Sequence, residues 1–350
     1  MTVIYPMSTE VLNHNVFLKN APLNFNFTGE KWGVLFLNMG GPETLDDIEP
    51  FLFNLFSDRN IIKLPLSFLF QKPLAKFISS RRAVKVRGNY EAIGGGSPLL
   101  KWCYAEASGV RKLLAEKYPR VETYVGMKYT RPFIKKALDR AEADGCRHLV
   151  VLPLYPHYTL ATTGTALEDV AAWLKETGAD ISVSIIADWY DQPAYIALLR
   201  RRIERAMAKT GNPESAVLLF SAHSLPVKMV ERGDPYLNQV KETVRLAAGE
   251  REHRLTFQSR SGPVKWLEPE TMATISALGQ KGVKEIVIVP VSFVSDHIET
   301  LHEIDIELKD IALKNGVKNF IRTESFNDDP DFIRLLTDMV LAKIKESGAV

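Results

Sequence analysis

Three glutamates within residues 296–307 are the part of this sequence best suited to chemistry. Glu299, Glu303 and Glu307 recur at intervals of four, shortly after the apolar run Ile286–Val291. On a helix, that interval places the three carboxylates on one face, where they repel one another unless cations or water intervene. Such a face is either a solvated acidic surface or a place that holds a divalent cation and moves protons.

The elements around these glutamates favour the second interpretation. The run Ile286–Val291 is rich in β-branched residues and has no polar alternation, which is typical of a strand buried on both faces of a parallel sheet. Asp296 fits the N-cap of a helix over residues 297–313. Open α/β sheets bind ligands beyond the carboxyl ends of their strands, so the acidic face would begin where a ligand is expected.

His223 is a second candidate for chemistry. It follows the apolar run 216–220 in the loop SAHSLP, which Pro226 stiffens and which lacks the glycines of a serine-hydrolase elbow. A structural histidine remains the alternative. If the strands before His223 and Glu299 are the first and third of one doubly wound unit, both side chains meet at one sheet edge. Imidazole with carboxylate suits Fe²⁺ or Zn²⁺, and it also suits proton removal near neutral pH.

The order of elements predicts an α/β fold. Strand-like runs alternate with helical patterns from residue 33 onward, which favours parallel sheets with right-handed crossovers. A repeat supports two sheets over one, because ALDRAEADGCRHLVVLPLYP from Ala137 resembles TISALGQKGVKEIVIVPVSF from Thr274, 137 residues later. We therefore predict two similar doubly wound Rossmann-like domains, each with a four-stranded parallel sheet, and a cleft between them.

Composition excludes several classes of protein. The chain has 350 residues, 46% hydrophobic and 25% charged, which is typical of a globular protein of two domains. A net charge of +2 gives no sign of nucleic-acid binding, and two cysteines cannot form a disulfide framework. We see no membrane-spanning run and no secretory signal. These features predict a cytoplasmic protein in a reducing compartment.

Several longer segments resemble the ferrochelatase family, whose members insert ferrous iron into protoporphyrin at the end of haem synthesis. They occur in the family's order between about residues 32 and 330. The matching segments are LNMGGPETLDDIEPFLFNLFSDRNIIKLP from Leu37, IGGGSPL from Ile93, YPHYTLATTGT from Tyr155, SAHSLPVKMVERGDPY from Ser221, FQSRSGPVKWLEPET from Phe257 and SDHIETLHEIDIE from Ser295.

The resemblance implies a role for each matching site residue. His223 and Glu299 would be the central pair, which binds or passes the metal and handles the pyrrole protons. Glu303 and Glu307 would lead away from that pair as a proton or metal relay. Lys128 departs from the arginine of many members, so a cation remains but bidentate pairing is lost. The porphyrin would be contacted by Asn38, Met39, Lys128, Tyr129 and Phe293.

The resemblance also implies the partners and the domain limits. The substrates would be protoporphyrin IX and Fe²⁺, with no other cofactor. Leu160 stands where animal members have a cluster cysteine, so we predict a bacterial-type protein without an iron–sulfur cluster. Residues 60–82 would form a lip over the porphyrin entrance and a candidate contact with the inner membrane surface. The expected parts are an extension (1–30), a first domain (31–164), a second domain with the metal site (165–325) and a terminal helix on the first domain (326–350).

Two other functions stay open from the sequence. One is a chelatase for coproporphyrin or another tetrapyrrole, since such relatives share the fold; the form SDHIETLHEIDIE favours the protoporphyrin-using group. The other is a two-domain protein that carries a porphyrin or a metal without catalysis. The His223–Glu299 pair argues against the carrier, and an assay with each porphyrin and Fe²⁺ separates all three.

Overall fold

The computed structural model describes residues 25–59 and 67–346, and the side chains from residue 71 onward in the second range. The chain divides into two compact units. One consists of Met1–Asp188 with Asn327–Val350, and the other of Trp189–Phe326. The greater part of the expected extension 1–30 and the start of the expected lip 60–82 lie outside the described residues.

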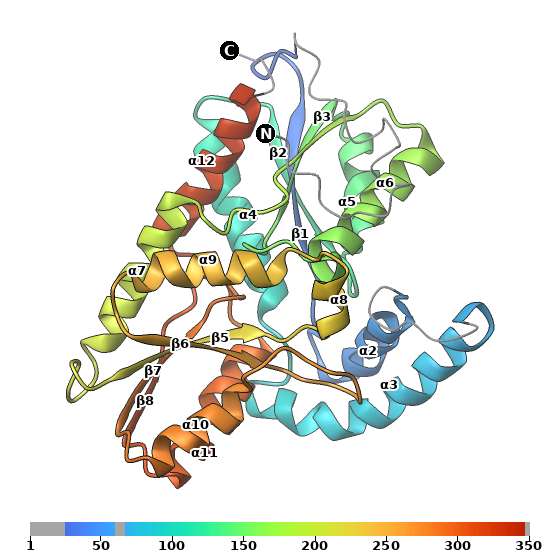
Figure 1. The fold of residues 1–350 in the computed structure, drawn as a ribbon. Coiled ribbons are helices and arrows are strands. Elements are labelled where there is room, and N and C mark those ends of the chain that lie inside the picture. Colours follow the sequence, from blue (N-terminus) through green and yellow to red (C-terminus); the bar gives the residue numbers. More distant parts are fainter. Residues whose placement is uncertain (1–24, 60–66, 347–350) are drawn as a thin grey trace. The chain divides into compact units, whose positions relative to one another are not determined.

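The first unit contains a parallel four-stranded sheet in the order β2-β1-β3-β4 (Figure 1). Its central strands are fully buried, as the continuous apolar runs predict. One face packs on α5 and α6, and the other packs on α4 and α12. The bounds are β1 Trp32–Asn38, β2 Val121–Met127, β3 His148–Pro153, β4 Ser182–Ile185, α4 Leu99–Ala115, α5 Ile134–Ala143, η2 Leu160–Gly164, α6 Thr165–Thr177 and α12 Pro330–Glu346.

The second unit contains a sheet of the same kind in the order β6-β5-β7-β8. Helices α10, η3 and α11 cover one face through a core that includes Leu219 and Ile288, and α7 and α9 lie on the other. The bounds are β5 Val217–His223, β6 His253–Gln258, β7 Glu285–Pro290, β8 Asn319–Arg322, α7 Pro193–Met207, α8 Val227–Glu231, α9 Tyr236–Ala248, α10 Thr271–Gln280, η3 Glu299–Leu308 and α11 Lys309–Lys314.

The two units repeat the same backbone pattern. In each, the residue after the third strand donates to the end of the first strand: Leu154 N to Leu37 O at 2.9 Å, and Val291 N to Ser221 O at 3.0 Å. The strand orders match as well. The predicted fold of two Rossmann-like domains with four-stranded parallel sheets is therefore confirmed.

The boundary between the units differs from the one expected at residue 165. Strand β4 pairs with β3, so Ser182–Ile185 complete the first sheet, and α6 packs on α5 in the same unit. The second unit begins at Trp189 instead. At the other end of the chain, α12 packs against α4 and β3 within the first unit.

Two segments of the first unit depart from the expectation of a loose extension and a short lip. Phe25 and Phe27 are buried, and both rings contact the ring of His148, so the chain is attached from residue 25 onward. Helix α3 spans Ser67–Ala92 and continues well beyond residue 82. It packs on α2 (Ile48–Ser57), and Gln71 Nε2 donates to Phe56 O at 2.8 Å. The short helix η1, Leu45–Asp47, precedes α2.

Candidate active site

His223 is the last residue of β5 and is held by three hydrogen bonds. Its backbone N donates to Ser292 Oγ at 3.1 Å, and its carbonyl accepts from the Tyr236 hydroxyl at 2.9 Å. Its ring Nδ1 lies 2.7 Å from Ser224 O. A carbonyl only accepts, so Nδ1 carries the proton and Nε2 keeps a lone pair. Nε2 is therefore the nitrogen of His223 that could bind a metal ion or accept a proton.

Glu299 begins η3, which is a π-helix and not the α-helix expected over residues 297–313. π-helices close i→i+5 hydrogen bonds, are rare, and are frequently found at functional sites. The three glutamates still occupy successive turns. The side chain of Glu299 is 22% exposed and that of Glu307 is 45% exposed. The carboxylates therefore lead from a mostly enclosed position toward solvent.

Glu299 pairs with His297 in the described structure, and no direct bond to His223 is found among its contacts. Glu299 Oε2 lies 3.1 Å from His297 Nε2, while His297 Nδ1 faces Ser295 O at 3.0 Å. Because a carbonyl oxygen only accepts, Nδ1 donates to Ser295 O, and Nε2 is the ring nitrogen that faces the Glu299 carboxylate. The Phe293 ring lies 6.2 Å from the His223 ring and 4.3 Å from the His297 ring, between centroids.

Glu303 accepts three hydrogen bonds from the end of β6. Ser259 N donates to Oε1 at 2.8 Å, Ser259 Oγ donates to Oε2 at 2.5 Å, and Gln258 Nε2 donates to Oε2 at 3.0 Å. Burial raises the pKa of Glu303, as does the negative charge of Glu299, while these hydrogen bonds and His223 act in the opposite direction. His223, Glu299 and Glu303 therefore form one electrostatic neighbourhood.

A buried hydroxyl network orients the Gln258 amide. Ser221 Oγ donates to Gln258 Oε1 at 2.6 Å and lies 2.9 Å from Thr271 Oγ1, which donates to Thr256 Oγ1 at 2.9 Å. Thr256 Oγ1 in turn donates to Phe220 O at 3.0 Å. Because Oε1 is occupied as an acceptor, Nε2 must face Glu303. Sequence reasoning missed this network, although FQSRSG was one of the matching segments.

Arg322 anchors η3 to the end of β8. Its guanidinium makes a bidentate pair with Asp305 at 2.9 and 2.8 Å and lies 3.2 Å from Asp296 Oδ1. The expected N-cap role of Asp296 is wrong, because the π-helix starts later and Asp296 accepts from Ser325 Oγ at 2.7 Å and pairs with Arg322. No motif in the sequence pointed to Arg322.

The expected porphyrin contacts of the first unit lie together at the carboxyl ends of β1 and β2. Lys128 N donates to Asn38 O at 2.9 Å, and Tyr129 N donates to Met39 O at 3.0 Å. Asn38 and Tyr129 are buried, whereas Met39 is partly exposed. The Asn38 amide donates to Cys103 Sγ at 3.3 Å. Of these residues, Met39 is the better placed to touch a ligand.

The Lys128 ammonium is already balanced by acids of its own unit. It lies 2.8 Å from Asp169 Oδ1 and 3.8 Å from Asp58 Oδ2, and it donates to Thr165 O at 3.0 Å. The Tyr129 hydroxyl donates to the same Asp58 oxygen at 2.9 Å. A ligand carboxylate would have to compete with two carboxylates for Lys128.

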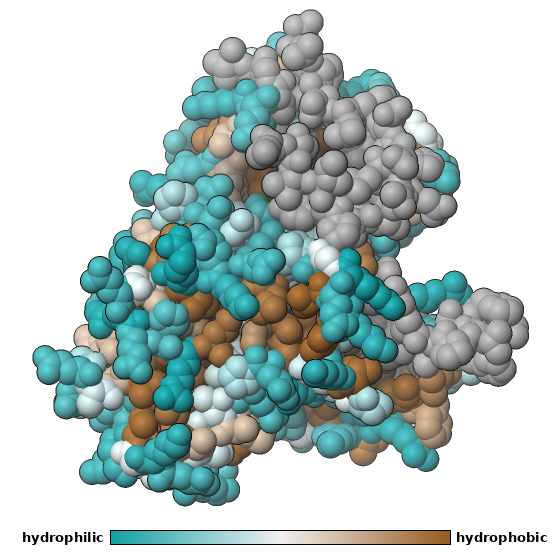
Figure 2. All heavy atoms as spheres, viewed as in Figure 1, coloured by the Kyte–Doolittle hydropathy of each residue, from teal (hydrophilic) through white to brown (hydrophobic). Residues whose placement is uncertain are grey.

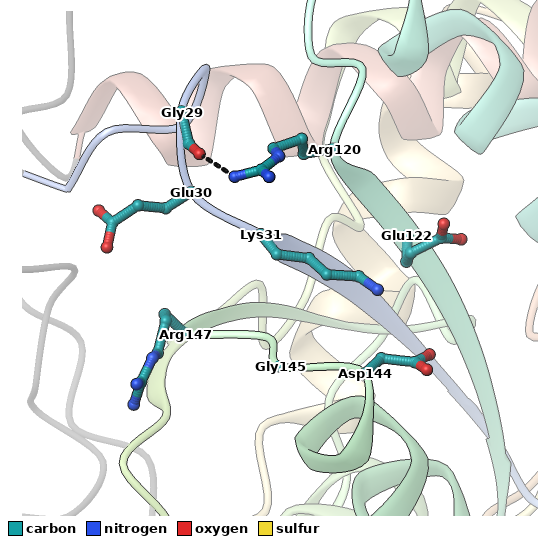
Figure 3. A pocket seen from close by; sticks show the side chains of 8 residues that line it. All are labelled: Gly29, Glu30, Lys31, Arg120, Glu122, Asp144, Gly145 and Arg147. Carbon is teal, nitrogen blue, oxygen red and sulfur yellow. Dashed lines mark hydrogen bonds between the residues drawn. The ribbon is translucent and has the colours of Figure 1, made fainter.

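A pocket of about 540 Å³ opens at the opposite edge of the first sheet, around the amino ends of its strands (Figure 3). Its charged residues are mixed in sign and partly paired: Arg120 donates to Gly29 O at 2.6 Å, and Arg147 pairs with Asp180. Ligands of doubly wound sheets bind at the carboxyl edge, so this pocket is not the candidate site.

Within residues 25–59 and 67–346, no three His, Cys, Asp or Glu side chains gather so as to hold a metal ion. No helix in the same ranges has both the length and the apolar character needed to cross a bilayer.

Comparisons with known proteins show the family of this chain. A family model described as Ferrochelatase matches residues 31–344. Ferrochelatase-2, chloroplastic, from Cucumis sativus is 45% identical over 332 residues, which cover 92% of this chain but 65% of that protein, so this chain spans less than two thirds of the plant relative. A ferrochelatase from Citrifermentans bemidjiense is 43% identical over 318 residues, 90% of this chain and 99% of the relative.

A solved structure, SirB from Bacillus subtilis with Fe³⁺, shares the fold at a TM-score of 0.53 and 13% identity, and covers 90% of this chain and 97% of that one. The likeness at this identity concerns the fold alone. The family match over residues 31–344 and the bacterial relative confirm the resemblance seen in the sequence segments. The chain belongs to the ferrochelatase family.

Proposed function

We propose that this protein is a ferrochelatase, a lyase of haem synthesis that inserts Fe²⁺ into protoporphyrin IX and releases two protons. Family membership supports the activity. The observation that carries the proposal is the fixed tautomer of His223, whose Nδ1 donates to Ser224 O and leaves Nε2 as an acceptor. The carboxylate line that begins at Glu299 lies in the same electrostatic neighbourhood.

The reaction requires a base and a route for protons. A flat free-base porphyrin hides its nitrogen lone pairs between two N–H groups, and a site complementary to a bent ring exposes them and lowers the barrier. Neutral His223 would accept a pyrrole proton at Nε2. The Glu299 carboxylate, which lies 3.1 Å from His297 Nε2, would take this proton on and pass it to Glu303 and Glu307 as Fe²⁺ enters.

His223 and Glu299 would also contact the metal, and the porphyrin nitrogens would supply the remaining ligands. Met39 and Phe293, whose side chains are partly exposed, would each contact the macrocycle, and Asn38 and Tyr129 would contribute from the first unit. Lys128 would bind a propionate only by exchanging its bond to Asp169. The remaining part of the proposal is that no iron–sulfur cluster and no other cofactor takes part.

We propose a cytoplasmic enzyme whose lip touches the inner membrane surface. Phe77 and Val84 on α3 are 54% and 80% exposed, and the Arg81 guanidinium stacks 4.3 Å from the Phe77 ring centroid. Figure 2 shows apolar surface where α2 and α3 lie in Figure 1, with hydrophilic side chains around it. Aromatic and basic side chains on one helix suit an interfacial contact. Flotation with anionic vesicles should carry the protein upward, and absence of binding would refute the contact.

The activity test uses the purified protein with Fe²⁺ under anaerobic conditions. Absorbance should show haem formation with protoporphyrin IX, and faster turnover with coproporphyrin would assign the other substrate. His223→Ala should lower turnover by about 10²–10⁴-fold while porphyrin binding, measured by fluorescence quenching, persists. His253→Ala is the matched control, because His253 begins β6 at the opposite edge of the same sheet. Near-normal turnover of His223→Ala would refute the assigned role.

A further inference from the structure

Ser259 has a backbone conformation that is unusual for its residue type. Among non-glycine residues of the described ranges, positive φ values occur at Ser259 (64°) and Asn327 (49°). The left-handed region is unfavourable for residues with a Cβ, and such outliers cluster at functional sites. Ser259 directly follows β6 at the carboxyl edge of the second sheet, the edge at which β5 ends in His223.

The conformation lets one residue hold both oxygens of a carboxylate. Ser259 N reaches Glu303 Oε1 while Ser259 Oγ reaches Glu303 Oε2, so the two donors form a fork across the carboxylate. Gln258 Nε2 adds a third donor at Oε2. Bidentate hydrogen bonds to a charged group fix its orientation as well as its energy.

The same turn is tied to the loop that carries His223. Ser224 N donates to Gln258 O at 2.9 Å, and Ser224 O accepts from the His223 ring. One short stretch of backbone therefore fixes the imidazole on one side and the Glu303 carboxylate on the other. A glutamate side chain has several rotatable bonds, and holding it in one rotamer before the reaction removes an ordering cost from the transition state.

We propose that Ser259 is a positioning residue for metal insertion, and that its left-handed backbone serves to clamp Glu303 in register with Glu299 and His223. This inference deepens the proposed ferrochelatase function and rests on it for its catalytic part. The clamp itself is a statement about geometry and can be tested without turnover.

Two variants of Ser259 distinguish the effect of its hydroxyl from the effect of its backbone strain. Ser259→Ala removes Oγ and keeps the strain, whereas Ser259→Gly removes both. Asn327→Gly relieves strain at the other left-handed position and is the matched control. We expect kcat to fall about ten-fold or more in both Ser259 variants. The KM for porphyrin should stay unchanged, the melting temperature of Ser259→Gly should not fall, and Asn327→Gly should keep full kcat.

A second readout measures the clamp independently of activity. Melting temperatures of Ser259→Ala, Glu303→Gln and the double variant form a thermodynamic cycle, and a direct contact makes their shifts non-additive. Additive shifts would refute the clamp. Non-additive shifts with full kcat in Ser259→Gly would refute the positioning role. If the unaltered protein inserts no metal into any porphyrin, the proposed function and the catalytic part of this inference fail, and the cycle alone decides the clamp.

Discussion

Gly96 is the position where a single methyl group should most disturb the first unit. A Cβ built on Gly96 would lie 2.0 Å from Glu43 O and 2.6 Å from Glu43 C, whereas real Cβ contacts stay beyond 3.0 Å. The obstacle is backbone, so no side chain can turn away. Ser97 N donates to Pro42 O at 2.7 Å beside it, which ties the segment IGGGSP to the loop after β1. Gly96→Ala must push that loop by about 1 Å, which also breaks the hydrogen bond.

The expected loss of stability is the sum of the cost of overpacking and the cost of the lost hydrogen bond. Overpacking against fixed structure costs about 1–3 kcal/mol and a lost backbone hydrogen bond about 0.5–1.5 kcal/mol, which together give about 2–4 kcal/mol. In a unit of roughly 200 residues this corresponds to a fall in melting temperature of about 5–15 °C. Because the displaced loop begins at Asn38 and Met39, the KM for porphyrin should rise as well.

Two other glycines serve as controls in differential scanning calorimetry. Gly94 has φ +106° with no atom within 4 Å of a built Cβ, so Gly94→Ala adds backbone strain of about 1 kcal/mol without a clash. Gly88 lies inside α3 with open space around it, so Gly88→Ala should stabilise the protein by about 0.5–1 kcal/mol. A melting temperature of Gly96→Ala within 1 °C of the unaltered protein would refute the reasoning.

Three further outcomes are expected. Arg322→Met should destabilise the second unit by about 2–4 kcal/mol in calorimetry, because it leaves Asp305 without its partly buried ion-pair partner. Arg322→Lys keeps the positive charge and should destabilise the unit less than Arg322→Met. Burial lowers the pKa of His148 to about 4, so the folded state resists its protonation. The contribution of neutral His148 to the free energy of unfolding is thus complete above pH 6.5, and up to about 3 kcal/mol of it is lost as the pH falls toward 4. In urea titrations, the free energy of unfolding of His148→Gln should fall less over this pH range. Cys103 and Cys146 are buried, so a thiol reagent should label them only after unfolding.

The sheets could be predicted from sequence because their strands carry a strong signal. A run such as Ile286–Val291 can be satisfied only by burial on both faces, and β7 is buried throughout. Placing His223 and the glutamates at one edge then followed from strand order alone. The boundary at residue 165 failed because α6 and β4 would fit either sheet, and only the pairing of β4 with β3 decides between them.

The details of the site depended on contacts that no local pattern encodes. The sequence did not predict that η3 is a π-helix, because apolar periodicity does not distinguish i→i+5 from i→i+4 hydrogen bonding. Glu299 pairs with His297 because both sit at the same helix start. The extent of α3 was not predicted, because a proline such as Pro73 usually ends a helix and the apolar residues of α3 follow no single face.

The division of the chain has a consequence for biosynthesis. The second unit interrupts the first, whose helix α12 leaves the ribosome after the whole of the second unit. The first and last residues of the second unit, Trp189 and Phe326, both pack against the ring of Tyr195. The ring centroids lie 5.0 Å and 6.0 Å from that of Tyr195. The segment 189–326 is therefore expected to complete its fold while the first unit still waits for its closing helix. His223 and the three glutamates would be assembled before the first unit, which carries Asn38 and Met39, gains the helix that packs on α4 and β3.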